Sequence, residues 1–208
     1  MSLFITFEGG EGSGKSYQTR LLYQKLKEIN IPVLLTQEPG GTSIGEHINR
    51  QIKWSQQHDI SPLSELLLFN ASRSQLVSEI IKPALEAGKV VLCDRFSDST
   101  IAYQGYGRGL DLNTVKAVND LATQGLKPDL TIFLEVPSAQ GLSRKSANRR
   151  DRFEQEDIDF HHRVLKGYHK LATAEPSRWL VVDGTRSKEE VAHDIWGHIN
   201  RLLSERQE

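Results

Sequence analysis

An apolar run that leads directly into a glycine-rich loop constrains the fold of this chain more than any other feature. Residues 3–7 are typical of a buried strand, and residues 9–16 match the pattern G-x-x-x-x-G-K-[ST]. A loop of this kind directs backbone N–H groups at phosphate oxygens where the next helix begins. Within the pattern, we expect Lys15 to reach the β- and γ-phosphates and the Ser16 hydroxyl to bind Mg²⁺. The predicted triphosphate-binding residues are Gly9, Gly10, Glu11, Gly12, Ser13, Gly14, Lys15 and Ser16.

Strand-like runs alternate with helical patterns along the rest of the chain. Four further apolar runs cover residues 32–35, 90–93, 130–134 and 179–182. The alternation predicts an α/β fold of the P-loop NTPase type, with three layers and a five-stranded, mostly parallel sheet flanked by helices. Because such sheets bind ligands at the carboxyl ends of their strands, we expect the chemistry in the loops that follow these runs.

Capping residues and prolines mark the ends of the predicted helices. Ser61-Pro62 predicts an N-cap followed by a first-turn proline, and Pro83 is expected to end or kink the same long helix before Gly88. The last helix is predicted to begin at a capping box formed by Ser187 and Glu190. Helices thus separate the predicted strands.

Composition narrows the class of protein. The 208 residues carry 26 basic and 27 acidic side chains, for a net charge of −1, so no global basic field exists to hold a nucleic-acid backbone. No run approaches the roughly 18 apolar residues of a membrane span. The single cysteine, Cys93, lies in an apolar run, where a small buried hydrophobe is expected. We expect one cytoplasmic domain over residues 1–208, with small-molecule substrates and neither nucleic acid nor a membrane as partner.

An acid and an arginine follow the run 90–93. Asp94 is suited to holding Mg²⁺, in part through water, and Arg95 offers a planar fork of donors that matches a phosphate. A guanidinium at this place suits a second, phosphorylated substrate better than a free water nucleophile. The alternative is an ordinary surface pair of opposite charges.

A basic segment lies downstream of the run 130–134. We expect a lid over about residues 142–154, because an arginine that arrives as a loop closes stabilises the charge of a phosphoryl group in transfer and excludes water. A solvated helix face is the alternative. The basic residues of the segment are Arg144, Lys145, Arg149, Arg150 and Arg152. The predicted catalytic residues are Lys15, Arg95, Arg149, Arg150 and Arg152.

Several segments, taken together and in order, resemble one family over essentially the whole chain. They are residues 7–16, Glu38-Pro39-Gly40-Gly41-Thr42, Asp94-Arg95-Phe96, residues 100–105 and Phe153-Glu154-Gln155-Glu156. These segments are similar to those of thymidylate kinase, and the arginine-rich lid combined with a phosphate loop free of arginine resembles the bacterial type. The resemblance implies transfer of the γ-phosphoryl group of ATP to dTMP with Mg²⁺, which gives dTDP and ADP and supplies a precursor of dTTP.

The resemblance also implies which residues bind dTMP. Phe69 would stack on thymine, Arg73 would donate to O4, and Thr100 and Gln104 would address the N3 edge. The alternatives are that Phe69 extends the apolar stripe of Leu66 and that Arg73 is a solvated helix residue. The full implied set is Glu11, Glu38, Phe69, Arg73, Arg95, Thr100, Tyr103 and Gln104.

The remaining implied roles concern sugar, phosphate and adenine. Tyr103 would occupy the place of a ribose 2′-hydroxyl, and Glu11 would accept a hydrogen bond from the 3′-hydroxyl of dTMP. Arg186 could stack on adenine, or residues 183–186 could be a plain loop. One departure from the family is Gln37, where the family often has an arginine, so a cation near the phosphates is missing.

Other functions stay as alternatives. The sequence lacks the N-K-x-D segment of a regulatory GTPase and the basic face of a nucleic-acid motor. A closer competitor is a kinase for another nucleotide, and dUMP in particular differs from dTMP by one methyl group. The resemblance further implies a homodimer, which the apolar helices permit. Which lid arginine is catalytic stays open.

Overall fold

The computed structural model describes residues 2–54, 60–145 and 151–205, and strands alternate with helices along these ranges. All five predicted strands are present, each extended by one or two residues at its carboxyl end. In chain order the elements are β1 (Leu3–Glu8), α1 (Lys15–Glu28), β2 (Val33–Gln37), α2 (Ser43–Trp54), α3 (Pro62–Leu76), the π-helical segment η1 (Val77–Ile81), α4 (Lys82–Glu86), β3 (Val90–Asp94), α5 (Ser97–Thr100), the π-helical segment η2 (Ile101–Gly107), α6 (Leu112–Thr123), β4 (Leu130–Glu135), α7 (Ser138–Ser143), α8 (Ile158–Ala174), β5 (Trp179–Asp183) and α9 (Lys188–Glu205).

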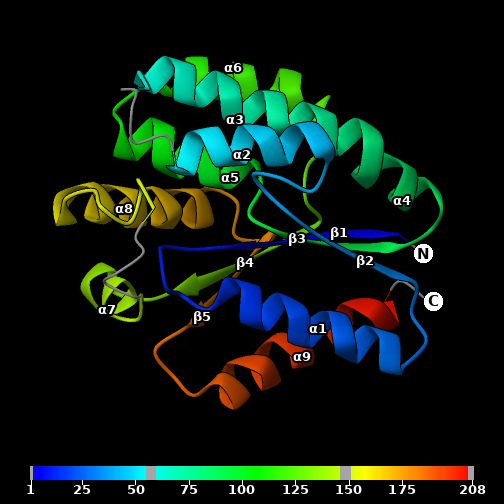
Figure 1. Ribbon diagram of the computed structural model, residues 1–208. Helices are drawn as coiled ribbons and strands as arrows, with labels where there is room; N and C mark the ends of the chain where they lie inside the picture. Colours follow the sequence, from blue (N-terminus) through cyan, green and yellow to red (C-terminus); the bar gives the residue numbers. More distant parts are fainter. Residues whose placement is uncertain (1, 55–59, 146–150, 206–208) are drawn as a thin grey trace.

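The strands form one sheet in the order β2-β3-β1-β4-β5, and every neighbouring pair is parallel. Figure 1 shows α1 and α9 on one side of this sheet and α2, α3, α6 and α8 on the other. The prediction of a three-layer α/β fold is therefore confirmed. β1, which leads into the phosphate loop, lies at the centre of the sheet.

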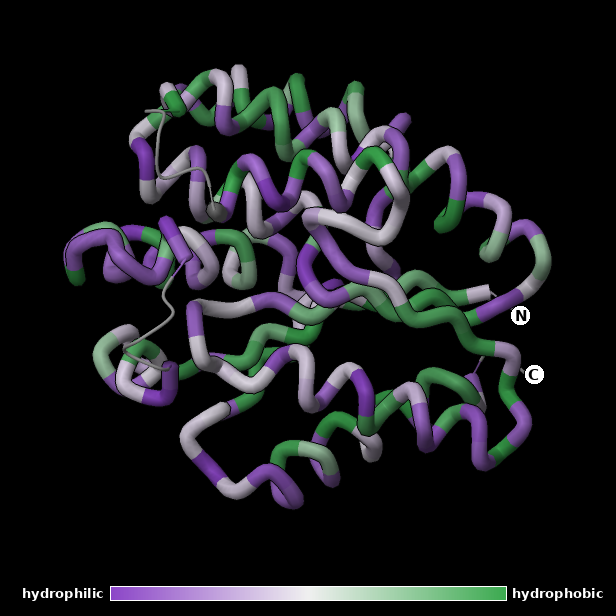
Figure 2. The backbone as a smooth tube through the Cα atoms, in the orientation of Figure 1, coloured by the Kyte–Doolittle hydropathy of each residue, from purple (hydrophilic) through white to green (hydrophobic). Residues whose placement is uncertain are grey.

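Successive side chains of β1 enter two different cores because a strand alternates its faces. Ile5 and Phe7 pack with Leu26 of α1 on one face, whereas Phe4 meets Phe96 edge to face on the other, with ring centroids 4.8 Å apart. The inner strands are apolar along nearly their whole length, as Figure 2 shows. Burial on both faces fixes the strands, and so also the loops that leave them.

Helix ends follow the predicted signals, with one refinement at Pro83. Ser61 caps α3 by accepting a hydrogen bond from the Ser64 N–H. Pro83 was expected to end or kink this helix. The chain instead widens into η1 just before the proline and continues to Glu86, with the Lys82 N–H bonded to the Val77 carbonyl. A widened turn accommodates the proline, which has no N–H to donate and whose ring crowds the preceding turn.

The parallel sheet brings three loops to one edge. Phe7 of β1 and Gln37 of β2 both stand opposite Asp94 of β3, so these strands end level with one another. The loops that follow them carry Glu11, Glu38 and Arg95. Residues far apart in the sequence are thereby gathered at a single place. Among the described helices, none combines the length and apolar character needed to cross a membrane.

Candidate active site

Two adjoining cavities open at this edge of the sheet. The inner cavity is lined by Phe69, Arg73, Thr100, Tyr103 and Gln104 among others. The loop cavity is lined by residues 11–16 of the phosphate loop and by Gln37, Asp94, Arg144 and Lys145. Their shared wall consists of Glu11, Glu38, Pro39, Lys53, Arg95 and Asp151. Two ligands could therefore meet at this wall.

Hydrogen bonds from Lys15 to other residues of the phosphate loop hold this loop together. The Lys15 Nζ donates to the carbonyls of Gly9 (3.0 Å) and Gly10 (2.7 Å) and to the Ser13 hydroxyl (3.2 Å). Burial, reinforced by the nearby positive charge of Arg95, lowers the pKa of Lys15 to about 8. Gly12 has a φ of +67° and lies so close to α7 that a Cβ there would collide with the Gly141 carbonyl, so a side chain is excluded at this position.

Ser16 and Asp94 lie together at the floor of the loop cavity. The Ser16 hydroxyl donates to the Asp94 carboxylate, which brings both predicted Mg²⁺ ligands to one point. The described residues contain no cluster of three or more His, Cys, Asp or Glu side chains able to hold a metal ion. A hydroxyl and a carboxylate fit Mg²⁺, which keeps several waters and takes other ligands from phosphates.

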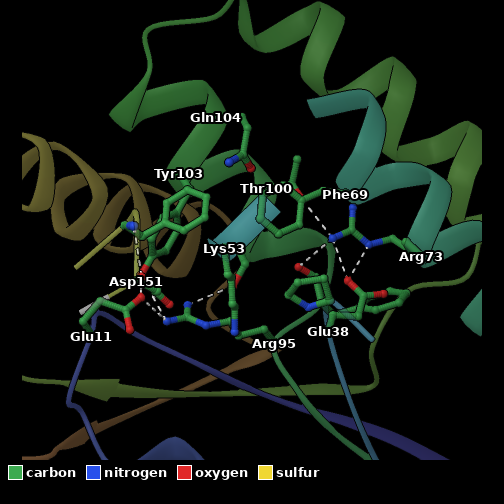
Figure 3. Close-up of a pocket in the computed structure, with 14 residues that line it drawn as sticks. Glu11, Glu38, Lys53, Phe69, Arg73, Arg95, Thr100, Tyr103, Gln104 and Asp151 are labelled. Atoms are coloured by element: carbon green, nitrogen blue, oxygen red, sulfur yellow. Dashed lines mark hydrogen bonds and ion pairs between the residues drawn. The ribbon is translucent and has the colours of Figure 1, made fainter. Parts of the chain in front are cut away.

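Arg95 is part of the shared wall of the two cavities. Figure 3 shows its side chain extending toward Glu11. Its backbone is left-handed, with a φ of +69°, and its guanidinium donates to the Glu11 carboxylate at 2.7 Å and to the Tyr103 hydroxyl at 3.1 Å. Burial alone would raise the pKa of Glu11, but the charges of Arg95 and Lys15 and the hydrogen bond from Tyr103 outweigh it and lower the pKa to about 2. Glu11 therefore faces Arg95 as a carboxylate.

A buried acid that sequence reasoning passed over supports Arg95 from below. Glu8 accepts hydrogen bonds from the Phe96 N–H, the Ser99 hydroxyl and the Tyr168 hydroxyl. Ser99 and Tyr168 each also lie 3.3 Å from Nη1 of Arg95. Burial raises the pKa of Glu8 to about 7. The polar end of an apolar strand was a usable signal for Glu8, whereas nothing in the sequence singled out Tyr168 on α8.

The inner cavity is built around a fully buried arginine. The Arg73 guanidinium donates to Glu38 at 2.8 Å, to Asn119 at 2.7 Å and to Thr100 at 2.9 Å. Its side chain is 1% exposed, so it is not a solvated helix residue. The second Glu38 oxygen, Oε1, is buried and receives no hydrogen bond within the described residues. Because Glu38 lines both cavities, this oxygen is an acceptor at their shared wall that the described residues leave unpaired.

Aromatic rings and one amide complete the inner cavity. Phe69 and Phe153 face the cavity with ring centroids 5.8 Å apart, and Tyr103 lies 5.9 Å from Phe153. Gln104 is almost wholly buried, and its Nε2 donates to Glu65 at 2.8 Å. The cavity thus offers a flat apolar plate together with hydrogen-bonding groups at its far end.

The described part of the basic segment reaches both cavities from above. Arg144 donates to the Gly184 carbonyl at 3.1 Å and lies over the phosphate loop, and Lys145 pairs with Glu154 at 2.7 Å. Arg152 points elsewhere, since it pairs with Glu65 and donates to the Ile52 carbonyl at 3.1 Å.

Comparison with known proteins decides the family. The thymidylate kinase family model matches residues 7–195. The chain is 54% identical to the thymidylate kinase of Dehalococcoides mccartyi, over 98% of each chain, and 48% identical to that of a Roseiflexus species, over 98% of this chain and 96% of the relative. A crystal structure of thymidylate kinase from Ehrlichia chaffeensis superposes with a TM-score of 0.79 at 37% identity, covering 95% of this chain and 98% of the other. The chain belongs to the thymidylate kinase family.

Membership of the thymidylate kinase family makes the chain an enzyme, a kinase of nucleotide biosynthesis, and confirms the resemblance found in the sequence. The individual site residues stay predictions. The structure gathers most of the set around the two cavities. Arg149 and Arg150 lie outside the described residues, and Arg186 is exposed and paired with Asp194 and Glu190, so it does not border either cavity.

Besides Glu8 and Tyr168, two further residues in this thymidylate kinase site were missed by sequence reasoning. Lys53, at the end of α2, and Asp151 both line the shared wall. Lys53 is of interest because Gln37 borders the loop cavity without a charge. A lysine near the end of a helix has no local signature, so only the tertiary structure identifies it.

Proposed function

We propose that the chain transfers the γ-phosphoryl group of Mg·ATP to dTMP, giving dTDP and ADP and so supplying a dTTP precursor. The observation that carries the proposal is the shared wall: Arg95 stands between a phosphate loop and a cavity shaped for a flat base. A kinase that joins two nucleotides needs their phosphates to meet, and the wall supplies a guanidinium fork there.

ATP would occupy the loop cavity. Its β- and γ-phosphates would replace the carbonyls of Gly9 and Gly10 as partners of the Lys15 ammonium. Ser16 and Asp94 would hold Mg²⁺, which would neutralise part of the phosphate charge. Arg186 would reach adenine only by leaving Asp194 and Glu190.

dTMP would occupy the inner cavity. Phe69 would stack on thymine, Arg73 with Thr100 would face the O4 side, and Gln104 would face N3. Tyr103 would exclude a 2′-hydroxyl, and Glu11 would accept from the 3′-hydroxyl. Arg95 would then exchange part of its contact with Glu11 for the dTMP phosphate, and Glu38 would stand beside both substrates.

The reaction needs no strong base, because a phosphate monoester is already anionic and attacks directly. Catalysis rests on positioning and on charge stabilisation by Lys15, Arg95 and a lid arginine. Arg144 already lies over the phosphate loop, whereas Arg152 would have to leave Glu65 to take part. We place the lid at about residues 142–154 of a single domain spanning 1–208.

Assembly and location complete the proposal. Four exposed apolar side chains, Ile44, Leu63, Leu67 and Leu121, lie on α2, α3 and α6, and we propose that these helices form a homodimer contact. ATP and nucleoside monophosphates are cytoplasmic metabolites, so the proposed reaction places the enzyme in the cytoplasm.

ADP release with Mg·ATP tests the proposal, with dTMP, dUMP, dCMP, dGMP, AMP and thymidine as acceptors. We expect preference for dTMP, slower turnover of dUMP because a single methyl group contributes about 1–3 kcal/mol, and no turnover of thymidine. Preference for another monophosphate would overturn the inner-cavity assignments. Activity on thymidine would overturn the role of Arg95 toward an acceptor phosphate.

A further inference from the structure

A buried acid behind the inner cavity has no part in the proposed reaction. Glu65 of α3 is fully buried and lines neither cavity. A carboxylate without partners is costly in such a place, so the contacts that hold it are informative.

Four donor contacts saturate the two oxygens of Glu65. Oε1 accepts from Nε2 of Gln104 at 2.8 Å and from Nε of Arg108 at 3.2 Å. Oε2 accepts from Nη2 of Arg108 at 3.3 Å and from Nη2 of Arg152. The guanidinium of Arg108 thus spans both oxygens as a fork, and Gln104 brings a neutral amide to the same carboxylate.

This contact decides which way the Gln104 amide points. A carboxylate only accepts hydrogen bonds, so the amide NH₂ must face Glu65 and Oε1 must face away from it. Gln104 lines the inner cavity, and its Oε1 receives no hydrogen bond from the described residues. In Figure 3 the Gln104 side chain reaches down toward the cavity, with its nitrogen and oxygen on opposite sides. Oε1 of Gln104 therefore presents a hydrogen-bond acceptor of fixed orientation to the cavity.

We propose that Glu65 is a positioning residue for base selection. By holding Oε1 of Gln104 toward the inner cavity, it favours a pyrimidine whose N3 carries a hydrogen, as in thymine and uracil. It disfavours cytosine, whose N3 is itself an acceptor. This inference rests on the proposed phosphorylation of dTMP. Arg152 binds the same carboxylate, which ties the end of the basic segment to the residue that faces the base.

The test compares dTMP with 5-methyl-dCMP, which keeps the methyl group, sugar and phosphate and differs only at N3 and at position 4. In Glu65→Gln, either end of the new amide can face Gln104, so the Gln104 amide is free to turn over. The ratio of kcat/KM for dTMP to that for 5-methyl-dCMP should fall about tenfold, the size expected when one buried hydrogen bond loses its alignment. The dTMP to dUMP ratio, which reports the methyl contact, should not change.

Two further variants separate positioning from a general loosening. Gln104→Met removes the amide and keeps Glu65, and should lower the dTMP to 5-methyl-dCMP ratio by a similar factor, with no additional fall in the double variant. Arg108→Lys breaks the fork on the same carboxylate but keeps the contact to Gln104, and should lower the melting temperature while leaving the ratio unchanged.

The outcomes distinguish the inference from the function it rests on. A dTMP to 5-methyl-dCMP ratio that stays at the wild-type value in Glu65→Gln, with dTMP turnover retained, overturns the role of Glu65 alone. An equal fall of the ratio in Arg108→Lys also overturns it. Absence of dTMP turnover in the wild-type enzyme overturns the proposed function itself.

Discussion

The inner cavity and the loop cavity hold their cations in opposite ways. In the inner cavity, Arg73 donates to Glu38, Asn119 and Thr100, side chains that come from distant parts of the chain. In the loop cavity, Lys15 donates to carbonyls and a hydroxyl of its own loop. One cation holds the fold together, whereas the other is kept in place by groups that a ligand can replace.

This difference between the two cations predicts which hydrogen bonds would have to change when substrates bind. The cation of the inner cavity is already fixed without a ligand, because the Arg73 guanidinium has its partners within the protein. In the loop cavity, a phosphate bound as proposed would exchange one set of Lys15 hydrogen bonds for another, so the net gain would come from charge and geometry rather than from a larger number of contacts. Substitutions at the two sides should therefore fail differently, in stability on one side and in activity on the other.

The largest effect is expected on the inner side. Arg73→Met should lower the free energy of unfolding by about 3–5 kcal/mol, because it leaves the buried Glu38 carboxylate without its cation. Urea unfolding measures the change, with Arg201→Met at an exposed position of α9 as the matched control. Equal stability of the two variants would mean that the inner side is not held together by Arg73.

In the loop cavity, Lys15→Met should lower activity rather than stability. We expect kcat to fall by roughly 10²–10³-fold, as when a donor to transition-state charge is lost. The stability should be unchanged or higher, since burial already penalises the ammonium and lowers its pKa to about 8. Phosphoryl transfer and thermal melting would be followed side by side, against Lys116→Met. A large loss of stability would contradict the contrast between the two sides.

Glu11 lies on the shared wall, and its ionisation should make the free energy of unfolding depend on pH. Its pKa falls from an ordinary 4.5 to about 2 in the folded protein. The stability that the ionised group contributes is therefore complete above pH 4.5 and is lost as the pH falls from 4.5 to 2. Wild type should lose about 3 kcal/mol relative to Glu11→Gln over this window in urea unfolding. Parallel profiles would refute the pairing with Arg95, and Glu86→Gln serves as the exposed control.

The smallest effect concerns the uncharged residue beside the loop cavity. Gln37→Arg should lower KM for dTMP by up to about fivefold, because an exposed charge adds at most about 1 kcal/mol of attraction. The gain should shrink as salt is added. Steady-state kinetics at two ionic strengths measure it, with Gln24→Arg on α1 as control. An unchanged KM would indicate that Arg95 and Lys53 already supply the charge needed.

Sequence patterns could predict the fold of the protein and many of the residues that line the two cavities. The five strands and the phosphate loop follow from local signals, since apolar runs and glycines act over a few residues. The family motifs placed Glu38, Arg73 and Gln104 at one site, although no local rule says that they lie close together. What the patterns could not give is the set of partners. Glu65 has no motif of its own, and its contact with Gln104 spans two elements.

The basic segment shows a related limit of prediction from sequence. Its charge is evident in the sequence, yet charge alone does not say which arginine faces a phosphate. Arg144 lies over the phosphate loop, while Arg152, eight positions on, is held by a buried acid. The direction of each side chain depends on the elements packed around it, so the number of arginines in the segment does not give the number that lie over the phosphate loop.

The place of β1 in the sheet has a consequence for how the chain is made. Leu3 pairs with Val90, and Ile5 pairs with Leu130, so the strand that leads into the phosphate loop waits for partners synthesised much later. Parallel pairings over such separations form slowly, and the waiting strand is one of the most apolar segments of the protein. During synthesis the future centre of the sheet is therefore exposed to aggregation until residues beyond 130 have emerged and its second neighbouring strand can pair with it.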